Sequence, residues 1–156
     1  MFIFEKNNKM KITFISDTHT KHHQVTSQLP GGDLLIHAGD FSSRGYEHEV
    51  DGFFDWFNSL DNYTNKIVIA GNHDFMFEDD PMLAKDIISY YPNITYLQDD
   101  LEVIGEDYSS SVKVWGSPWQ PEFYNWAFNL PRNGVELEEK WAMIPPRTDI
   151  LITHGP

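Results

Sequence analysis

The chain has 156 residues, of which 40% are hydrophobic and 15% aromatic, so it can build one core and is too short for two comfortable domains. Its 11 Lys and Arg against 24 Asp and Glu give a formal charge of -13, which disfavours extended nucleic-acid binding but permits a small phosphate ester beside bound cations. The absence of cysteine excludes disulfides, thiolate zinc sites and cysteine nucleophiles, so any metal must be held by His, Asp, Asn or Glu.

The N-terminal segment MFIFEKNNKM is too short and too polar for a signal peptide, and the apolar runs are only a few residues long. We therefore expect a soluble, cytoplasmic protein that has no membrane segment. No internal repeat or long linker interrupts the sequence, so we expect one domain over residues 1–156.

Short apolar runs rich in β-branched residues predict buried strands at residues 11–16, 33–37, 66–70, 94–97, 112–115 and 149–153. Apolar residues at spacings of three and four predict an amphipathic helix over 46–60: Val50, Phe53, Phe54 and Phe57. Residues 81–90 resemble a second helix. Residues 105–134 are rich in Ser, Pro, Trp and Asn, which predicts a hairpin and an irregular loop that could wall a substrate pocket.

Polar residues follow four of the predicted strands. Because the carboxyl ends of parallel strands meet at one crevice in an α/β fold, these side chains are expected to converge. They occur in SDTH, HAGD, AGNHD and THG and are Asp17, His19, Asp40, Asn72, His73 and His154.

Each residue type in these motifs suits a metal-assisted hydrolysis. A carboxylate such as Asp40 can bridge two metals, and Gly39 before it lets the backbone turn sharply. Gly71 is expected to permit an unusual backbone in the same way. The amide oxygen of Asn72 can bind a metal, whereas the imidazole of His73 can donate a proton.

The ordered blocks SDTH, AGD, GNHD and THG resemble those of the calcineurin-like metallophosphoesterases. The phrases DLLIHAGDFSSRG, KIVIAGNHD and DILITHGP resemble the metallophosphoesterase-domain-containing, UPF0046-like phosphodiesterase branch. The resemblance covers roughly residues 10–156 and implies an α/β fold: a β-sandwich flanked by helices in αββα layers.

The resemblance also implies two divalent metal ions, with manganese expected and iron or zinc as alternatives. Asp17, His19 and Asp40 would hold the first metal, and Asp40, Asn72 and His154 the second. His73 would lie beside the scissile phosphate as the catalytic residue, with Asp74 or Asp17 as a carboxylate that orients it. Asn72 and His73 would contact the substrate. Arg44 is a further candidate for substrate contact on the chemistry of its guanidinium, and not through the resemblance.

The implied reaction is hydrolysis of small or cyclic nucleotide phosphodiesters by metal-activated hydroxide. Two alternatives stay open: a phosphomonoesterase or phosphoprotein phosphatase, and a catalytically weak nucleotide-binding or scaffold domain. The family's later G-H-x-H block is not reached before Pro156. We therefore expect the C-terminal part of the fold to be absent, and an oligomer or a complementing segment to supply the remaining histidines.

Ordinary roles are expected for other conspicuous residues. His37 is expected to bond to backbone, and His48 to be solvated. His22 and His23 are expected at the loop surface, where their closeness to SDTH also permits a role at the substrate mouth. Glu78 to Asp80 should be a solvated helix start. Arg44 and Arg132 could meet phosphate oxygens or form surface ion pairs. Most aromatic residues of the later region should be core, although they could instead form a nucleobase platform: Trp115, Trp119, Phe123, Trp126 and Phe128.

Overall fold

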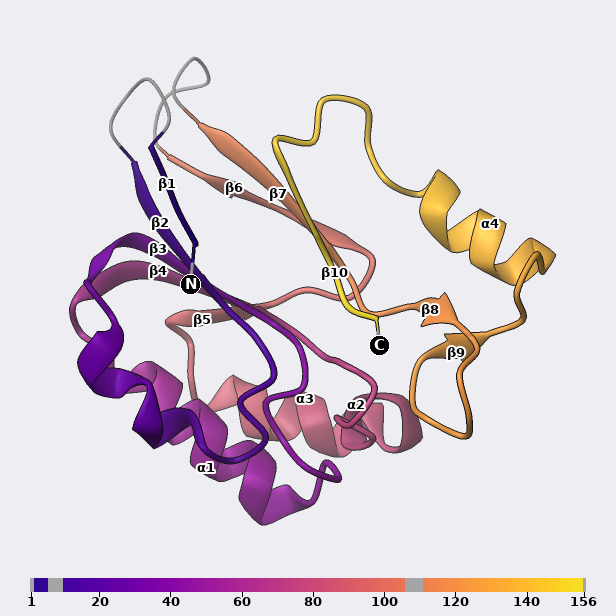
Figure 1. Ribbon diagram of the computed structural model, residues 1–156, viewed down its shortest axis with the longest axis horizontal. Helices are drawn as coiled ribbons and strands as arrows, with labels where there is room; N and C mark the ends of the chain where they lie inside the picture. Colours follow the sequence, from indigo (N-terminus) through magenta and orange to yellow (C-terminus); the bar gives the residue numbers. More distant parts are fainter. Residues whose placement is uncertain (1, 6–9, 106–110, 156) are drawn as a thin grey trace.

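The computed structural model describes residues 2–5, 10–105 and 111–155. Its larger sheet has the strand order β1-β2-β3-β4-β5 (Figure 1). Strands β2 to β5 run parallel, and β1 is antiparallel to β2. Their bounds are β1 Phe2–Glu5, β2 Lys11–Ile15, β3 Gly32–Ala38, β4 Tyr63–Ile69 and β5 Ile94–Tyr96.

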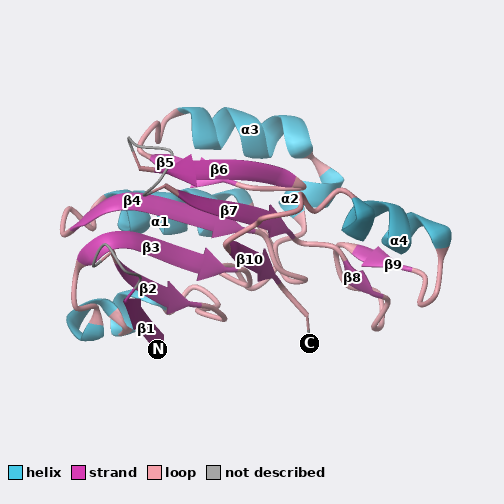
Figure 2. Cartoon of the chain, turned by 90° about the horizontal axis from the view of Figure 1, so that it is seen from above, coloured by secondary structure: helices cyan, strands magenta, loops and turns pink. Residues whose placement is uncertain are grey.

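A second sheet packs against the first. It has the order β10-β7-β6, with β6 antiparallel and β10 parallel to β7. A short parallel pair, β8 and β9, follows β7 (Figure 2). The bounds are β6 Asp100–Ile104, β7 Val112–Ser117, β8 Gln120–Pro121, β9 Asn129–Leu130 and β10 Ile150–Thr153.

Four α-helices and two short 3-10 helices complete the described fold. In Figure 1, α1 to α3 lie on the side of the larger sheet that faces away from the smaller sheet. The bounds are α1 Glu47–Asn58, α2 Met76–Asp79, α3 Pro81–Ser89, α4 Val135–Ala142, η1 His22–Gln24 and η2 Thr26–Gln28.

Two apolar cores hold these layers together, because successive side chains of a strand point to opposite faces. On β3, Leu34 and Ile36 enter an aliphatic core between the sheets, and Leu35 enters the core beneath the helices. The helix-side core is largely aromatic, and the rings of Phe41 and Phe53 stack there at 4.3 Å. The predicted α/β sandwich with flanking helices is therefore confirmed.

Most predicted elements are found. Helix α1 buries Val50, Phe53, Phe54 and Phe57, as their spacing predicted. Asp80 caps α3 by accepting a bond from the Leu83 amide at 3.1 Å. Residues 106–110, part of the hairpin and loop predicted over 105–134, lie outside the described residues, as does Pro156. Within the described ranges, no helix has the length and apolar character needed to cross a bilayer.

Two histidine predictions are wrong. His22 lies in η1 and is buried, its ring 4.8 Å from that of Trp56, because the helix-side core extends beneath this loop. His37 is fully buried, and its Nε2 pairs with the Thr18 hydroxyl oxygen at 3.0 Å and not with backbone. His23 and His48 are exposed, as expected.

Candidate metal centre

The loops that follow β2 and β3 are paired to each other by backbone bonds. The amide of Asp17 donates to the Gly39 carbonyl oxygen at 3.0 Å, and that of His19 to the Asp40 carbonyl oxygen at 3.0 Å. Asp17, His19 and Asp40 all have positive φ, at 54°, 40° and 56°. Residues other than glycine rarely adopt this conformation, and they do so mainly where surrounding structure and function require it.

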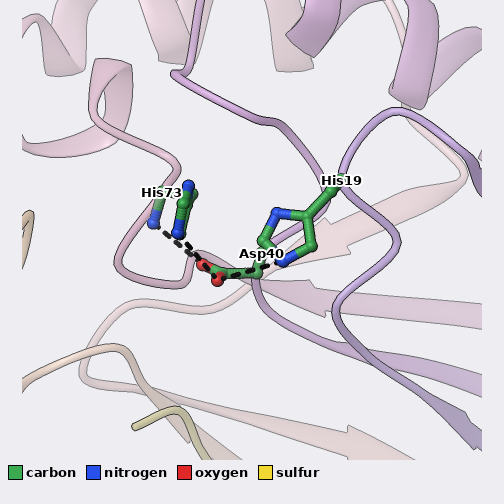
Figure 3. A group of neighbouring side chains, drawn as sticks. All are labelled: His19, Asp40 and His73. Atoms are coloured by element: carbon green, nitrogen blue, oxygen red, sulfur yellow. Dashed lines mark hydrogen bonds and ion pairs between the residues drawn. The ribbon is translucent and has the colours of Figure 1, made fainter. Parts of the chain in front are cut away.

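Asp40 stands at the centre of the converging side chains (Figure 3). Its Oδ2 lies 3.7 Å from Nε2 of His19 and 3.9 Å from Nε2 of His73. Its Oδ1 lies 3.4 Å from Nε2 of His154 and accepts the His73 amide at 2.8 Å. Three imidazole nitrogens thus face one buried carboxylate.

Each of these imidazoles is held at its other nitrogen. Nδ1 of His19 lies 3.2 Å from the Ser42 carbonyl oxygen, and Nδ1 of His73 lies 2.9 Å from that of Ser43. Nδ1 of His154 lies 2.7 Å from the Ala38 carbonyl oxygen. A carbonyl oxygen can only accept, so Nδ1 of each ring carries a proton and Nε2 is the nitrogen that faces Asp40.

Asn72 and Asp17 complete the set. The Asn72 side-chain oxygen lies 3.1 Å from Nε2 of His154. Potential ligand atoms of Asp17, Asp40 and His154 fall within 4.8 Å of one another, as do those of His19, Asp40 and His73. All six residues singled out in the sequence therefore meet, although Asp17 and His19 fall in different groups.

Asp40 and His154 shift each other's pKa values. Burial alone would raise the pKa of Asp40, but the hydrogen bond and charge of His154, with help from His73, lower it overall. Burial likewise opposes the charged form of His154, but its bonds to Asp40 and Ala38 raise its pKa. The carboxylate therefore stays ionised beside its imidazole partners.

Asp74 ties two of the loops together. Its Oδ2 accepts the amides of Asp40 at 2.9 Å and Gly71 at 2.7 Å. Its Oδ1 accepts the amide and hydroxyl of Ser42 at 2.9 and 2.6 Å. Asp74 is fully buried, and burial raises its pKa to about 7 against the effect of these bonds. Since His73 Nδ1 bonds to Ser43, Asp74 supports the backbone of the site and does not orient His73.

The two glycines of the site serve different purposes. Gly39 has φ of 95°, which matches the expected sharp turn. Gly71 has no positive φ, so the expectation of an unusual backbone there is wrong. A Cβ on Gly71 would instead collide with Asp40 Oδ1, and one on Gly39 would come within 2.9 Å of the Gly71 Cα. Gly71 is needed for space.

The predicted substrate residue Arg44 is exposed, and its Cζ lies 5.6 Å from the centre of the Trp126 ring. Trp126 in turn lies 4.1 Å from the His73 ring. Of the other aromatic candidates, Trp115 and Phe128 are buried and Trp119 is partly buried, whereas Phe123 is exposed. Arg132 donates from Nε to the Glu122 carbonyl oxygen at 3.2 Å.

The donor set fits divalent metals. Imidazole nitrogens, carboxylate oxygens and an amide oxygen suit manganese, iron and zinc. The Nε2 atoms of His19 and His154 face Asp40, and their Nδ1 atoms lie against carbonyl oxygens. Such second partners are typical of histidines that bind metals.

Known proteins resemble this chain in sequence and in architecture. The calcineurin-like phosphoesterase family matches residues 10–156. Metallophosphoesterase domain-containing protein 1 of Homo sapiens is 44% identical over 162 residues, covering 91% of this chain and 47% of that protein. A UPF0046 protein of Caenorhabditis elegans is 35% identical over 181 residues, covering 97% of this chain and 43% of its own.

A solved crystal structure has a TM-score of 0.57 and 18% identity, covering 91% of this chain and 66% of the other. At that identity the likeness shows the fold alone. The chain spans about half the length of the two relatives described, 47% and 43%. With the family match over residues 10–156, these findings show that the chain belongs to the calcineurin-like metallophosphoesterases.

Proposed function

We propose that this chain carries a metal-dependent phosphoesterase site whose preferred substrates are small or cyclic nucleotide phosphodiesters. One observation carries the proposal: the Nε2 atoms of three imidazoles lie 3.4 to 3.9 Å from the Asp40 carboxylate. Their Nδ1 atoms are bonded to carbonyl oxygens. A purely structural ion-pair cluster would not need three imidazole nitrogens aimed at one carboxylate.

In the proposed assignment, Asp17, His19 and Asp40 hold one divalent metal, and Asp40, Asn72 and His154 hold the other. Manganese is the expected metal, with iron or zinc as alternatives. When bound, such metals polarise phosphoryl oxygens and make hydroxide available at neutral pH. The central position of Asp40 suits a carboxylate that bridges the pair.

His73 is assigned the proton transfer. Its Nδ1 is fixed on the Ser43 carbonyl oxygen at 2.9 Å, and its Nε2 faces the site. A proton at Nε2 would be donated to the leaving oxygen as its bond to phosphorus breaks, or would stabilise the charge that develops there. Asn72 would contact the substrate from the same loop.

Arg44 is proposed to contact a phosphoryl oxygen. It is exposed, and no carboxylate in the described ranges forms an ion pair with it. A guanidinium at the mouth of the site would offset part of the -13 formal charge that an anionic substrate meets. The strong overall negative charge favours small substrates over extended anionic polymers.

The test combines metal analysis with turnover. Purified protein loaded with manganese is assayed on bis-p-nitrophenyl phosphate and on p-nitrophenyl phosphate, and then on a cyclic nucleotide. We expect about two metals per chain, faster hydrolysis of the diester, and loss of both metal and turnover in Asp40→Asn. His73→Ala should keep its metal and lose about a hundredfold or more in kcat.

Other outcomes would select the alternatives. Faster hydrolysis of the monoester would favour a phosphomonoesterase or phosphoprotein phosphatase. Bound metal and tight nucleotide binding without turnover would favour the scaffold alternative. A protein that takes up no metal from manganese, iron or zinc solutions would overturn the proposal itself.

A further inference from the structure

Trp126 lies in the segment between β8 and β9 and packs on the predicted proton donor. The centres of the Trp126 and His73 rings are 4.1 Å apart at an interplanar angle of 32°. Trp126 is partly buried, and Phe75 and Arg44 also lie against it, at 6.0 and 5.6 Å. One indole therefore contacts both His73 and the exposed cation of the site.

The segment that carries Trp126 is bonded to the loop that carries His73. The next residue, Ala127, donates its amide to the Asn72 carbonyl oxygen at 3.1 Å. The Phe128 amide donates to Glu78 Oε2 at 2.8 Å. Gln120 donates to the Ala127 carbonyl oxygen at 3.3 Å. Hydrogen bonds of the residues that follow Trp126 therefore fix the position of its indole.

Asn129 also holds the tip of this segment. Its Nδ2 donates to the carbonyl oxygens of Phe123 and Tyr124 at 3.2 and 2.7 Å. The segment is therefore built to a fixed shape on both sides of Trp126.

His73 needs a contact of this kind. Its hydrogen bond from Nδ1 to the Ser43 carbonyl oxygen restrains one point of the ring. The His19 ring lies nearly perpendicular to it, at 76° and 4.7 Å, and so restrains a second direction. A ring that covers the face of the imidazole restricts its tilting, and the indole of Trp126 lies over that face at 4.1 Å and 32°. Small errors in the position of a proton donor are costly to the rate.

We infer that Trp126 is a positioning residue that fixes the orientation of the His73 imidazole, which makes the β8–β9 segment part of the active site. The inference rests on the proposed function, because it concerns the same site. It also specifies the use of the aromatic residue: the ring surface that packs on His73 is not available to stack on a nucleobase.

A double-mutant cycle tests the inference on the manganese-loaded protein. Trp126→Leu removes the aromatic face, and Trp126→Phe retains one. We expect kcat for bis-p-nitrophenyl phosphate to fall about tenfold in Trp126→Leu and less than about threefold in Trp126→Phe, with KM and metal content unchanged. In the His73→Ala background, Trp126→Leu should cause almost no further loss, because residues that act through one another are not additive.

The matched control is Phe123→Leu, which removes an exposed aromatic side chain from the same segment and should leave kcat unchanged. Equal losses from Trp126→Leu with and without His73 would overturn the inference, since the residue would then act only on the structure. A rise in KM without a fall in kcat would overturn it in favour of a stacking platform.

A second readout, the proton NMR spectrum of the chelator-treated protein, does not depend on activity. The ring current of Trp126 should shift the imidazole C–H proton signals of His73, which are identified by their loss in His73→Ala. Trp126→Leu should move these signals, and Phe123→Leu should not. If the wild type binds metal but hydrolyses nothing, the proposed function fails, and this measurement still decides whether Trp126 orients His73; unmoved signals would overturn the inference.

Discussion

The two sheets contribute to the metal centre by different means. The loops after β2 and β3 are paired through backbone bonds, and the loop after β4 is tied to the loop after β3 by bonds that the Asp74 side chain accepts. The smaller sheet contributes His154 alone, held at Nδ1 by Ala38 of the other sheet. Its strand β10 pairs on one side with β7, and Leu151 on it is 50% exposed. One half of the site, the loops after β2, β3 and β4, is held by hydrogen bonds between loops, and we call it the bonded half. The other half, His154, depends on packing between the sheets, and we call it the packed half.

The largest effect is expected from breaking the bonded half. Asp74→Ala would leave the buried amides of Asp40, Ser42 and Gly71 without their acceptor. We expect unfolding free energy to fall by roughly 3–5 kcal/mol, measured by urea denaturation, with loss of bound metal. The exposed Asp79 is the control: Asp79→Ala should change stability by less than about 0.5 kcal/mol. Equal effects of the two changes would contradict the role given to Asp74.

A substitution at Gly71 tests how closely the bonded half is packed around Asp40. Because a Cβ there would collide with Asp40, Gly71→Ala should lower unfolding free energy by about 1–3 kcal/mol and reduce metal content. Gly52 lies in α1, with nothing within 4 Å of its added Cβ. Gly52→Ala should therefore stabilise the protein by about 0.5–1 kcal/mol. If Gly71→Ala and Gly52→Ala shift the urea midpoint in the same direction, lack of space at Gly71 is not what makes it necessary.

Acid should change the contributions of His37 and His154 to the unfolding free energy in opposite directions. Burial, aided by the charges of His154 and His22, lowers the pKa of His37 on β3 to about 3 from 6.5. The unfolded chain therefore takes up a proton first, and the stability present above pH 6.5 is lost as pH falls toward 3, by roughly 1.4 kcal/mol per pH unit at the steepest. The pKa of His154 is raised, so its contribution is full below pH 6.5 and is lost as pH rises through the folded value.

Urea denaturation of chelator-treated protein between pH 7 and 5 would measure this dependence. His37→Gln should flatten the loss of stability at low pH, because it removes the buried imidazole. An unchanged slope in His37→Gln would show that the loss arises elsewhere.

A smaller effect on stability is expected from the packed half. His154→Ala removes the contacts with the Ala38 carbonyl oxygen and the Asn72 side chain, which should cost about 1–2 kcal/mol. Elemental analysis should nevertheless show at least one metal fewer per chain, since a proposed ligand is lost. Full metal content in a folded His154→Ala protein would remove His154 from the ligand set.

The residues of the site could be found from sequence because each follows a strand: five follow the parallel strands β2, β3 and β4 of the larger sheet, and His154 follows β10 of the smaller sheet. Asp17, Asp40 and His154 are far apart along the chain, yet strand ends bring their ligand atoms within 4.8 Å. Their assignment to particular metals is still a prediction. Apolar, β-branched runs predicted β2, β3, β4, β5, β7 and β10, whereas β6 was not predicted although its Ile104 enters the core. The two-residue strands β8 and β9 carry too little pattern to be found.

The roles that sequence did not reveal depend on contacts between distant segments. The partners of Asp74 include Asp40 and Ser42, which lie 34 and 32 positions away, and no local pattern marks such a bond. His22 was expected at the loop surface, yet its ring packs on Trp56 from α1. Trp126 was one of several aromatic candidates, and only the fold distinguishes it from its neighbours.

The close approach of Gly39 and Gly71 also constrains protein engineering. A Cβ on Gly39 would lie 2.9 Å from the Gly71 Cα, so the two strand ends meet backbone to backbone before any ligand is placed. A designer who grafts the six side chains onto another scaffold must first reproduce this separation between neighbouring parallel strands. Sheets whose strand ends are spaced by ordinary side chains would hold the right residues at the wrong distances, however carefully the ligands themselves were chosen.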